Sequence, residues 1–381
     1  GGAIYSYYKT SDPENCTILG TDISYNEATT GGGICIIGGK CTIGPENATP
    51  TLIDHNMCSG SSTNADGGGL YIGASGDCTI RGGTKISNNS SKNGGGICNG
   101  GTLEIEGSSS EKVEIFANSV TGTGMFGKGG GIYQVRGLLK TKHTEIKNNS
   151  ATEKGGGIYV AGGRCILQDG TILGGGSDYN VVNGTGSNGG GVYVAGGAFV
   201  MESDARIVPS TGSAANTPGK NDVYLMQNQY ITLKSALSGT DPVARITPSQ
   251  YKAGRAVVKG DGYTLTASDA NRFTVTPEIV DGVTHKWELI PDSENFYKLK
   301  MGDAIIPSTG SNRWQKLKTE AEKTNGPDVI IINGEITATS SPGDYGEITI
   351  ARNLTIKGKT DATTDIINAN KNAGGKPKHR I

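Results

Sequence analysis

A glycine triplet followed by an aliphatic residue recurs through the first half of this 381-residue chain. Glycine loses more conformational freedom on folding than any other residue, so its repetition must meet a repeated structural need. Such self-similarity marks a repeat architecture, in which each unit buries its apolar residues by stacking on its neighbours. The seven copies, the first of which reads Gly-Gly-Ala, begin at Gly1, Gly31, Gly67, Gly94, Gly129, Gly155 and Gly189.

Two more apolar segments belong to each unit. One is a short strand-like segment such as Cys41-Thr42-Ile43, and the other is an aliphatic residue three positions before an asparagine, such as Ile53 before Asn56. Three short strands, three turns and no helical periodicity predict an all-β chain, folded as a right-handed parallel β-helix of about seven coils. A β-propeller is the alternative, but each of its blades requires a four-stranded meander.

The repeated glycines and asparagines have structural explanations. Strands of stacked units lie about 4.8 Å apart, so a corner residue lies on its equivalents in the neighbouring units. A corner that needs a positive φ or close backbone approach selects glycine. Asparagine tolerates the left-handed region, and stacked asparagine side chains can hydrogen-bond as a ladder. The expected asparagine column is Asn26, Asn56, Asn89, Asn118 and Asn149, continued in the sixth unit by Asn180 or Asn183.

Side chains alternate along a strand, so the residue after the first aliphatic residue of each unit is predicted to point outward. Five of these positions are tyrosines, and two are Cys35 and Cys98. An exposed tyrosine column could bind glycans or a protein partner, because tyrosine has an apolar ring and a polar tip. The alternative is a column that reflects only the β-propensity of tyrosine. The candidate binding residues are Tyr5, Tyr71, Tyr133, Tyr159 and Tyr193.

Every second unit has a longer loop before its glycine triplet, at residues 57–66, 119–128 and 178–188. Insertions of this kind map to one face of a repeat protein, which is often its binding face. Drift in tolerated surface loops is the alternative explanation.

The cysteines predict neither a metal site nor a disulfide framework. Cys16, Cys41, Cys78 and Cys165 share one position of the unit, where an inward side chain behaves as a small hydrophobe. The seven cysteines form no Cys-x-x-Cys pair and no spacing typical of metal ligands, so we expect free thiols, no metal and no cofactor.

Composition argues against several classes of partner. Lys plus Arg number 35 and Asp plus Glu number 36, with no run of either sign, so nothing predicts binding to nucleic acid or to an anionic membrane. No apolar stretch reaches the roughly 18–20 residues of a membrane helix. No signal peptide precedes the repeat pattern, which begins at Gly1, so we expect the chain to be a piece of a longer protein.

Enzymes that act on polysaccharides need clustered carboxylates for a cation or for acid–base chemistry, with a basic residue on the same face. The nearest candidate is Leu52-Ile53-Asp54-His55-Asn56, but these residues are the ordinary aliphatic-x-x-Asn element of their unit. No catalytic residues are therefore predicted, and the chain is expected not to be an enzyme.

Three domains are expected. Residues 1–227 contain the glycine triplets and form the β-helix, and residues 228–302 form a small β-rich module that caps it. Residues 303–381 begin with a linker, followed by an amphipathic helix that starts at Asn312 and ends before residue 325. The strands expected after this helix, at residues 329–332, 346–350, 353–358 and 365–367, indicate the start of a second β-helix.

The repeats resemble those of the polymorphic outer membrane proteins, which alternate Gly-Gly-Ala-(Ile/Leu/Val) with Phe-x-x-Asn. Residues 1–4 match the first motif, and across residues 1–200 an aliphatic residue replaces the phenylalanine of the second. The resemblance implies a secreted or cell-surface bacterial β-helix, extracellular or associated with the outer membrane, often an autotransporter-like passenger or adhesin. It carries over no catalytic residues.

We therefore expect a non-catalytic, adhesin-like protein that binds a host glycan or protein through outward loops and side-chain columns. The second hypothesis is a structural module of an extracellular fibre or sheath, whose copies associate head to tail. The third is a polysaccharide lyase or hydrolase.

Overall fold

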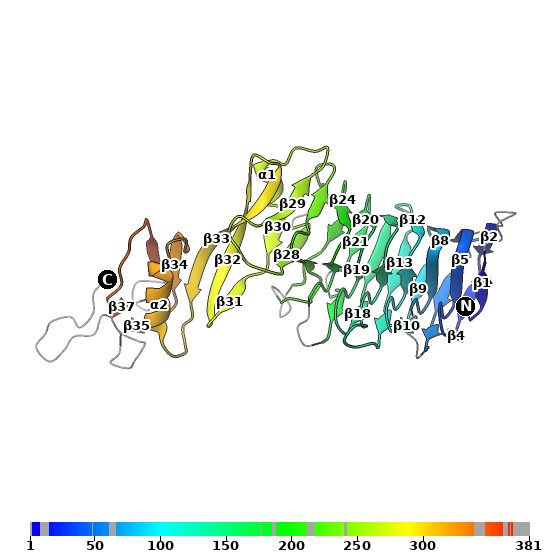
Figure 1. Ribbon diagram of the computed structural model, residues 1–381, viewed down its shortest axis with the longest axis horizontal. Coiled ribbons are helices and arrows are strands. Elements are labelled where there is room, and N and C mark those ends of the chain that lie inside the picture. Colours follow the sequence, from blue (N-terminus) through cyan, green and yellow to red (C-terminus); the bar gives the residue numbers. More distant parts are fainter. Residues whose placement is uncertain are drawn as a thin grey trace, which may run out of the picture. The chain divides into compact units, whose positions relative to one another are not determined.

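The computed structural model describes residues 2–7, 15–47, 49–60, 66–175, 177–184, 188–211, 217–239, 242–338, 347–360, 365 and 367–368 (Figure 1). The chain is 47% strand and 4% helix, with large parallel sheets, as the all-β prediction requires. It divides into two compact units. The first contains Gly1–Gln250, Ala256–Thr274 and Pro291–Lys298, and the second contains Tyr251–Arg255, Val275–Ile290 and Leu299–Ile381.

In the first unit, the strand that follows each glycine triplet pairs in parallel with its equivalent in the next repeat. The aliphatic residues are in register, so that Ile97 lies between Leu70 and Ile132. The strands of this first row are β1 (Ile4–Ser6), β5 (Ile34–Gly44), β8 (Leu70–Arg81), β11 (Ile97–Asn99), β15 (Ile132–Gln134), β19 (Ile158–Val160), β23 (Val192–Val194) and β26 (Val223–Leu225).

The second predicted strand forms a second in-register row, in which Leu103 lies between Cys78 and Leu139. The C-terminal halves of β5 and β8 belong to this row, because these two strands run through the turn that separates the rows in other repeats. Its other strands are β2 (Asn15–Leu19), β12 (Thr102–Glu106), β16 (Leu138–Lys142), β20 (Arg164–Leu167), β24 (Ala198–Met201), β27 (Ile231–Leu233) and β29 (Ala256–Gly260).

The third row is a separate seven-stranded parallel sheet, in which Ile53 lies between Ile23 and Ile86. In the sixth repeat the inward residue is Leu173, whose neighbours are Ile146 and Ile207. The strands are β3 (Asp22–Ser24), β6 (Leu52–Asp54), β9 (Lys85–Ser87), β13 (Val113–Phe116), β17 (Thr144–Lys147), β21 (Ile172–Leu173) and β25 (Arg206–Ile207).

A fourth row was not expected. It is a six-stranded parallel sheet of two-residue strands that directly follow the asparagines, so the repeat has four strands and not three. These strands pair with other repeats and not with each other, which is incompatible with the meander of a propeller blade. They are β4 (Glu27–Ala28), β7 (Met57–Cys58), β10 (Ser90–Ser91), β14 (Ser119–Val120), β18 (Ser150–Ala151) and β22 (Val181–Val182).

The inward side chains of these rows form the core of the first unit. Ile34, Ile43, Ile53, Leu70 and Ile80 are all fully buried. Each such side chain contributes about 1.5–3 kcal/mol when it is removed from water. Most inward positions stack on an apolar residue of the next repeat, so burial continues from repeat to repeat. An exception is the buried pair Asn99 and Gln134, which hydrogen-bond to each other.

The three glycines of a triplet have three different roles. Gly94 has a φ of 62°, which only glycine adopts without strain. A Cβ on Gly95 would lie 2.5 Å from the carbonyl oxygen of Gly130 in the next repeat. A Cβ on Gly96 would lie 3.1 Å from Nδ2 of Asn118. The prediction that these corners need a positive φ or close backbone approach is therefore confirmed, with the requirements assigned to different residues.

The parallel rows continue beyond residue 227, where the first predicted domain ends. Strand β28 (Ala244–Pro248) pairs in parallel with β26, and β29 pairs in parallel with β27. The glycine triplet is absent here, but the inward residues Ile231, Ile246 and Val258 remain apolar and fully buried. A short helix, α1 (Ala267–Ala270), and β30 (Phe273–Val275) follow.

The second unit is built on β31 (Glu278–Val280), most of β32 (Val283–Pro291) and β33 (Phe296–Ile306), and the elements that follow them. The predicted helix is confirmed as α2 (Arg313–Glu322), which buries Trp314, Leu317 and Ala321. Asn312 is its N-cap residue, but its side chain makes no capping hydrogen bond and its φ is 57°. The remaining strands are β34 (Val329–Ile332), β35 (Ile336–Thr337), β36 (Thr355–Gly358) and β37 (Ile367–Asn368).

Three of the four strands expected after this helix are present. Strands β33, β34 and β36 pair in parallel, and so do β35 and β37. The strand expected at residues 346–350 is not: residues 347–350 are not part of a strand, and residue 346 lies outside the described residues. None of the helices that the structure describes is long and apolar enough to span a membrane.

Candidate binding surfaces

The tyrosine column lies in register as predicted, but most of it is not exposed. Tyr5, on the first strand of the row, is 59% exposed, whereas Tyr159 is 7% and Tyr193 is 3% exposed. Tyr71 and Tyr133 are half-buried, and Cys35 and Cys98 in the same column are buried. The prediction of a fully exposed column is therefore wrong.

The column is buried because its rings cover one another. The ring centroids of Tyr159 and Tyr193 lie 5.2 Å apart, and those of Tyr193 and Tyr224 lie 4.8 Å apart. Burial is also the main cause that raises the pKa of Tyr133 to about 12. A sugar binds a tyrosine by its ring face, and here the neighbouring tyrosines occupy the faces. The stack from Tyr133 to Tyr224 is therefore a poor glycan platform.

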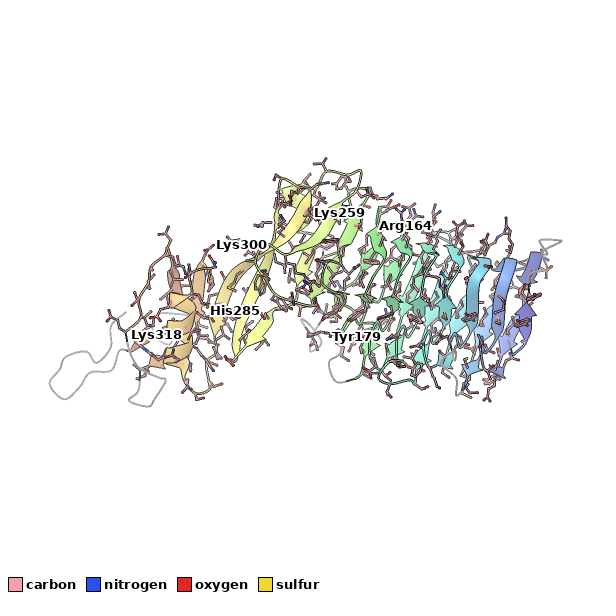
Figure 2. All side chains as sticks on the ribbon, viewed as in Figure 1. Arg164, Tyr179, Lys259, His285, Lys300 and Lys318 are labelled. Carbon is pink, nitrogen blue, oxygen red and sulfur yellow. The ribbon has the colours of Figure 1, made fainter. Side chains whose placement is uncertain are left out.

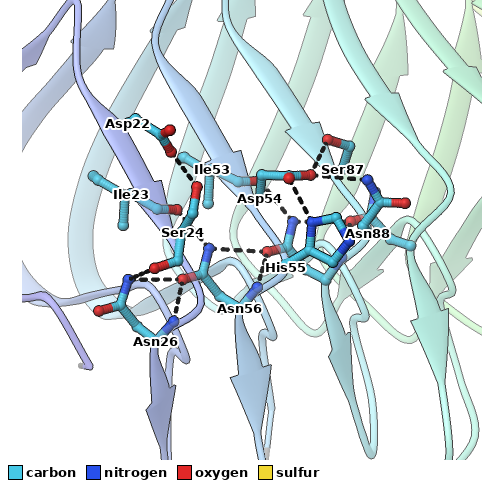
Figure 3. A network of polar contacts seen from close by, with 12 residues as sticks. Asp22, Ile23, Ser24, Asn26, Ile53, Asp54, His55, Asn56, Ser87 and Asn88 are labelled. Atoms are coloured by element: carbon cyan, nitrogen blue, oxygen red, sulfur yellow. Dashed lines mark hydrogen bonds and ion pairs between the residues drawn. The ribbon is translucent and has the colours of Figure 1, made fainter.

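The asparagine column forms the predicted ladder (Figure 3). Nδ2 of Asn56 donates to Oδ1 of Asn89 at 3.1 Å and to the carbonyl oxygen of Ile23 at 2.7 Å. The Asn56 backbone N–H also donates to Oδ1 of Asn89. The same pattern joins Asn89 to Asn118 and Asn118 to Asn149, all fully buried. The column ties each repeat to the next, which is a structural role.

Of the two residues that the prediction left open for the sixth unit, Asn180 continues the ladder and Asn183 does not, and the ladder then extends to Asn221. In one respect the ladder differs from the prediction. For the first five asparagines the left-handed conformation belongs to the preceding residue and not to the asparagine itself, whereas Asn221 itself has a φ of 50°. The preceding residues with positive φ are Tyr25, His55, Asn88, Ala117 and Asn148.

The cysteines are free thiols among the described residues, and Cys41, Cys78 and Cys165 are buried at the predicted inward position. Burial, the Cys41 charge and a hydrogen bond with Cys41 together raise the pKa of Cys16 to about 11. The Cys16 thiol is therefore a poor nucleophile at neutral pH. No group of three or more His, Cys, Asp or Glu side chains in the described parts of the chain is arranged to hold a metal ion.

Asp54 and His55 belong to residues 52–56, the nearest candidate for a catalytic site in the sequence, and their side chains contact each other. His55 Nδ1 lies 2.5 Å from Asp54 Oδ2, and its ring stacks on Tyr25 with centroids 4.9 Å apart. Burial opposes ionisation of Asp54, but hydrogen bonds from Ser87, Asn88 and His55 outweigh it and lower its pKa. An ionised Asp54 that accepts hydrogen bonds from three side chains orients the corner of the repeat.

The outer face of the seven-stranded sheet holds a charge network that sequence reasoning missed. Lys147 lies 2.8 Å from Glu145, Lys112 lies 2.6 Å from Glu145, and Lys85 lies 3.2 Å from Glu114. Hydrogen bonds from Lys112 and then Lys147 lower the pKa of Glu145. These charges satisfy one another, so this face offers few free groups to a ligand.

The outer face of the second strand row is different, because it is hollowed into a polar groove of 460 Å³ across β2, β5, β8 and β12. Two in-register rows of side chains line it. One row is Lys40, Asp77 and Thr102, and the other is Thr17, Thr42, Thr79 and Glu104. Within the described parts of the chain, these seven side chains form no hydrogen bond or ion pair with the protein.

The second row of the groove continues along the sheet beyond it. Its later members include Lys140, Ile166, Val200, Thr232 and Lys259, the last of which is marked in Figure 2. The polar character therefore changes to apolar at β20 and β24. The groove was missed because a single strand such as Lys40-Cys41-Thr42 shows only polar–apolar alternation, and the two rows exist only once the register is known.

The expected loops add little to this surface. Residues 61–65 and 185–187 of the first and third loops lie outside the described residues. The ends of these loops line up beside the glycine triplets, where Asp66 pairs with Asn93 and Lys154 pairs with both Lys128 and Asn188 through isolated parallel bridges.

Comparisons with known proteins give this chain no relative. No family model, no curated protein and no solved structure matches it.

Proposed function

We propose that the chain is a non-catalytic binding module with a right-handed parallel β-helix in its first unit, which holds a glycan in the groove across β2, β5, β8 and β12. The parallel rows support the β-helix, because strands that pair in parallel with successive repeats require a crossover between them. Crossovers of this kind are right-handed in about 98% of cases.

The observation that carries the binding proposal is the set of unpartnered polar groups in the groove. The groove supplies hydrogen-bond donors and acceptors in fixed positions. They are the hydroxyls of Thr42 and Thr79, the ammonium group of Lys40 and the carboxylates of Asp77 and Glu104. None of these groups forms a hydrogen bond or an ion pair with another residue that the structure describes. A polyhydroxylated ligand is the chemical class that such a mixture of donors and acceptors recognises.

The arrangement of the groove suits an extended ligand. Its two rows cross four neighbouring strands at the strand spacing of about 4.8 Å, so equivalent groups repeat along a line. Weak contacts at each strand then add along one chain of sugars, as in multivalent binding. A cell-surface or secreted location, which the repeat resemblance to polymorphic outer membrane proteins implies, is part of this proposal.

The test is a glycan array probed with the full chain, followed by calorimetry with the oligosaccharide that binds best. A Thr42→Val/Thr79→Val variant keeps the β-branched shape and removes two hydroxyls, and we expect it to bind at least tenfold more weakly. The matched control is Thr232→Val, which lies in the same row outside the groove. The proposal is overturned if the chain binds no glycan on the array, or if the double variant and the Thr232→Val control bind the oligosaccharide with equal affinity.

A further inference from the structure

A pair of lysines stands out on a different surface of the first unit, beside the tyrosine stack. Lys128 and Lys154 each precede a glycine triplet and are joined by a parallel bridge, so their side chains leave neighbouring repeats at the same position. Both are half-buried. Their ammonium groups lie over the stack, with Lys128 Nζ 5.6 Å from the ring centroid of Tyr159 and Lys154 Nζ 5.3 Å from that of Tyr193.

Neither lysine forms an ion pair with any residue that the structure describes. The charges of Asp66 and Glu153 favour the charged form of Lys128, but neither carboxylate makes a salt bridge with it among the described residues. Both carboxylates also accept hydrogen bonds from other groups, Asp66 from Asn93 Nδ2 and Glu153 from the Gly124 backbone N–H, each at 2.9 Å.

The strand register holds the two like charges together. Parallel partners in adjacent repeats lie about 4.8 Å apart, so the two lysine side chains start from neighbouring backbone positions. Burial, and then the charge of Lys154, lower the pKa of Lys128 and outweigh the charges of Asp66 and Glu153, which act in the opposite direction, so the two carboxylates compensate the pair only in part. An anion placed between the two ammonium groups would remove this repulsion and make charge-assisted hydrogen bonds to both.

We propose that Lys128 and Lys154 form a binding site for an oxyanion, a sulfate or carboxylate group carried by an acidic glycan or present as a free ion. The tyrosine rings form the base of the site and orient the ammonium groups through cation–π contacts. The site is separate from the groove and does not depend on it, because it uses different strands and different residues.

The first test measures thermal unfolding of the full chain in increasing sodium sulfate against sodium chloride of equal ionic strength. We expect a saturable stabilisation by sulfate, with half-saturation about tenfold higher in Lys128→Gln and in Lys154→Gln because each removes one of two close charges. Lys128→Arg keeps the charge and should keep the effect. Lys259→Gln, which removes one exposed charge elsewhere in the same unit, is the matched control.

A second arm distinguishes the two sources of the anion. Dextran sulfate and neutral dextran are titrated against the same variants at fixed salt concentration. If dextran sulfate binds, neutral dextran does not, and binding requires both lysines, the site is assigned to an acidic glycan. If only inorganic sulfate has an effect, the site is assigned to a free ion. A sulfate effect equal in all variants, or no lysine-dependent effect of either probe, overturns the proposal.

Discussion

Asn118 shows how a single repeated residue connects three repeats. Its side chain is fully buried, donates to the carbonyl oxygen of Ile86 and to Asn149 Oδ1, and accepts from the backbone N–H and Nδ2 of Asn89. All the hydrogen-bonding capacity of a buried amide is thus used between repeats. A buried polar group that lacks its hydrogen-bond partner destabilises the folded state, so this column favours the correct register of the repeats and stabilises their stack.

The Asn118→Ala variant should therefore lose stability. Several buried groups lose their partner, and each unsatisfied group costs about 1–3 kcal/mol, so we expect the free energy of unfolding to fall by about 3 kcal/mol or more. Urea denaturation followed by circular dichroism measures it. Asn148→Gly is the control, because Asn148 is exposed and has a φ of 54° that glycine adopts freely. Similar losses in the two variants would contradict the ladder's role.

Sequence reasoning located residues better than it assigned their conformations. The asparagine column was predictable because Asn56, Asn89 and Asn118 recur at one spacing from an isoleucine. The positive φ was assigned to the wrong residue, since the preceding position holds residues as different as Tyr25 and Ala117 and carries no compositional signal. The prediction that the tyrosines are exposed was wrong for another reason: burial by neighbouring rings depends on the spacing between repeats.

At the scale of elements, the apolar strands were predictable and the fourth row was not. Strands such as Ile231–Leu233 show apolar residues two apart, which is the signal of a half-buried strand. Ser90–Ser91 and Ser150–Ala151 are two residues long and mostly small, so no periodicity exists to detect. The groove was hidden for a related reason: it belongs to four strands together and to none of them alone.

In the second unit, a buried contact between two side chains joins α2 to β32. Glu320 and His285 are each less than one-tenth exposed, with His285 Nε2 3.0 Å from Glu320 Oε2, and Lys323 contacts Glu320 from the other side. Burial opposes ionisation of Glu320, but hydrogen bonds from His285 and Lys323 outweigh it and lower its pKa.

This lowered pKa predicts how stability depends on pH. The folded state favours the ionised Glu320, so its contribution is fully present above the unfolded pKa of about 4.3 and is lost as the pH falls through the folded pKa. The free energy of unfolding of Glu320→Gln, measured from pH 6 to pH 3, should therefore fall less steeply than that of the parent chain. Glu288→Gln, an exposed residue on β32, is the control and should keep the parental slope. Parallel pH profiles for the parent and Glu320→Gln would contradict the assignment.

At the scale of the whole molecule, the repeats of the first unit turn a short sequence pattern into extended surfaces. Inward positions carry the apolar core, the corners carry the glycines and the asparagine ladder, and the outward positions are left to vary. The outward rows are self-paired on the seven-stranded sheet, where Lys147 contacts Glu145. In the groove, Lys40 lies beside Asp77 and neither forms an ion pair with a described residue. The glycan-binding proposal therefore rests on positions that the fold does not constrain.

The most direct test of this conclusion is methyl NMR of the full chain with labelled threonines, titrated with the oligosaccharide that binds best on the array. We predict chemical-shift changes at the groove threonines Thr17, Thr42, Thr79 and Thr102, and none at Thr232 in the same row. Changes that reach Thr232 equally, or that spare all four groove threonines while the glycan binds, would contradict the assignment of the groove as the binding site.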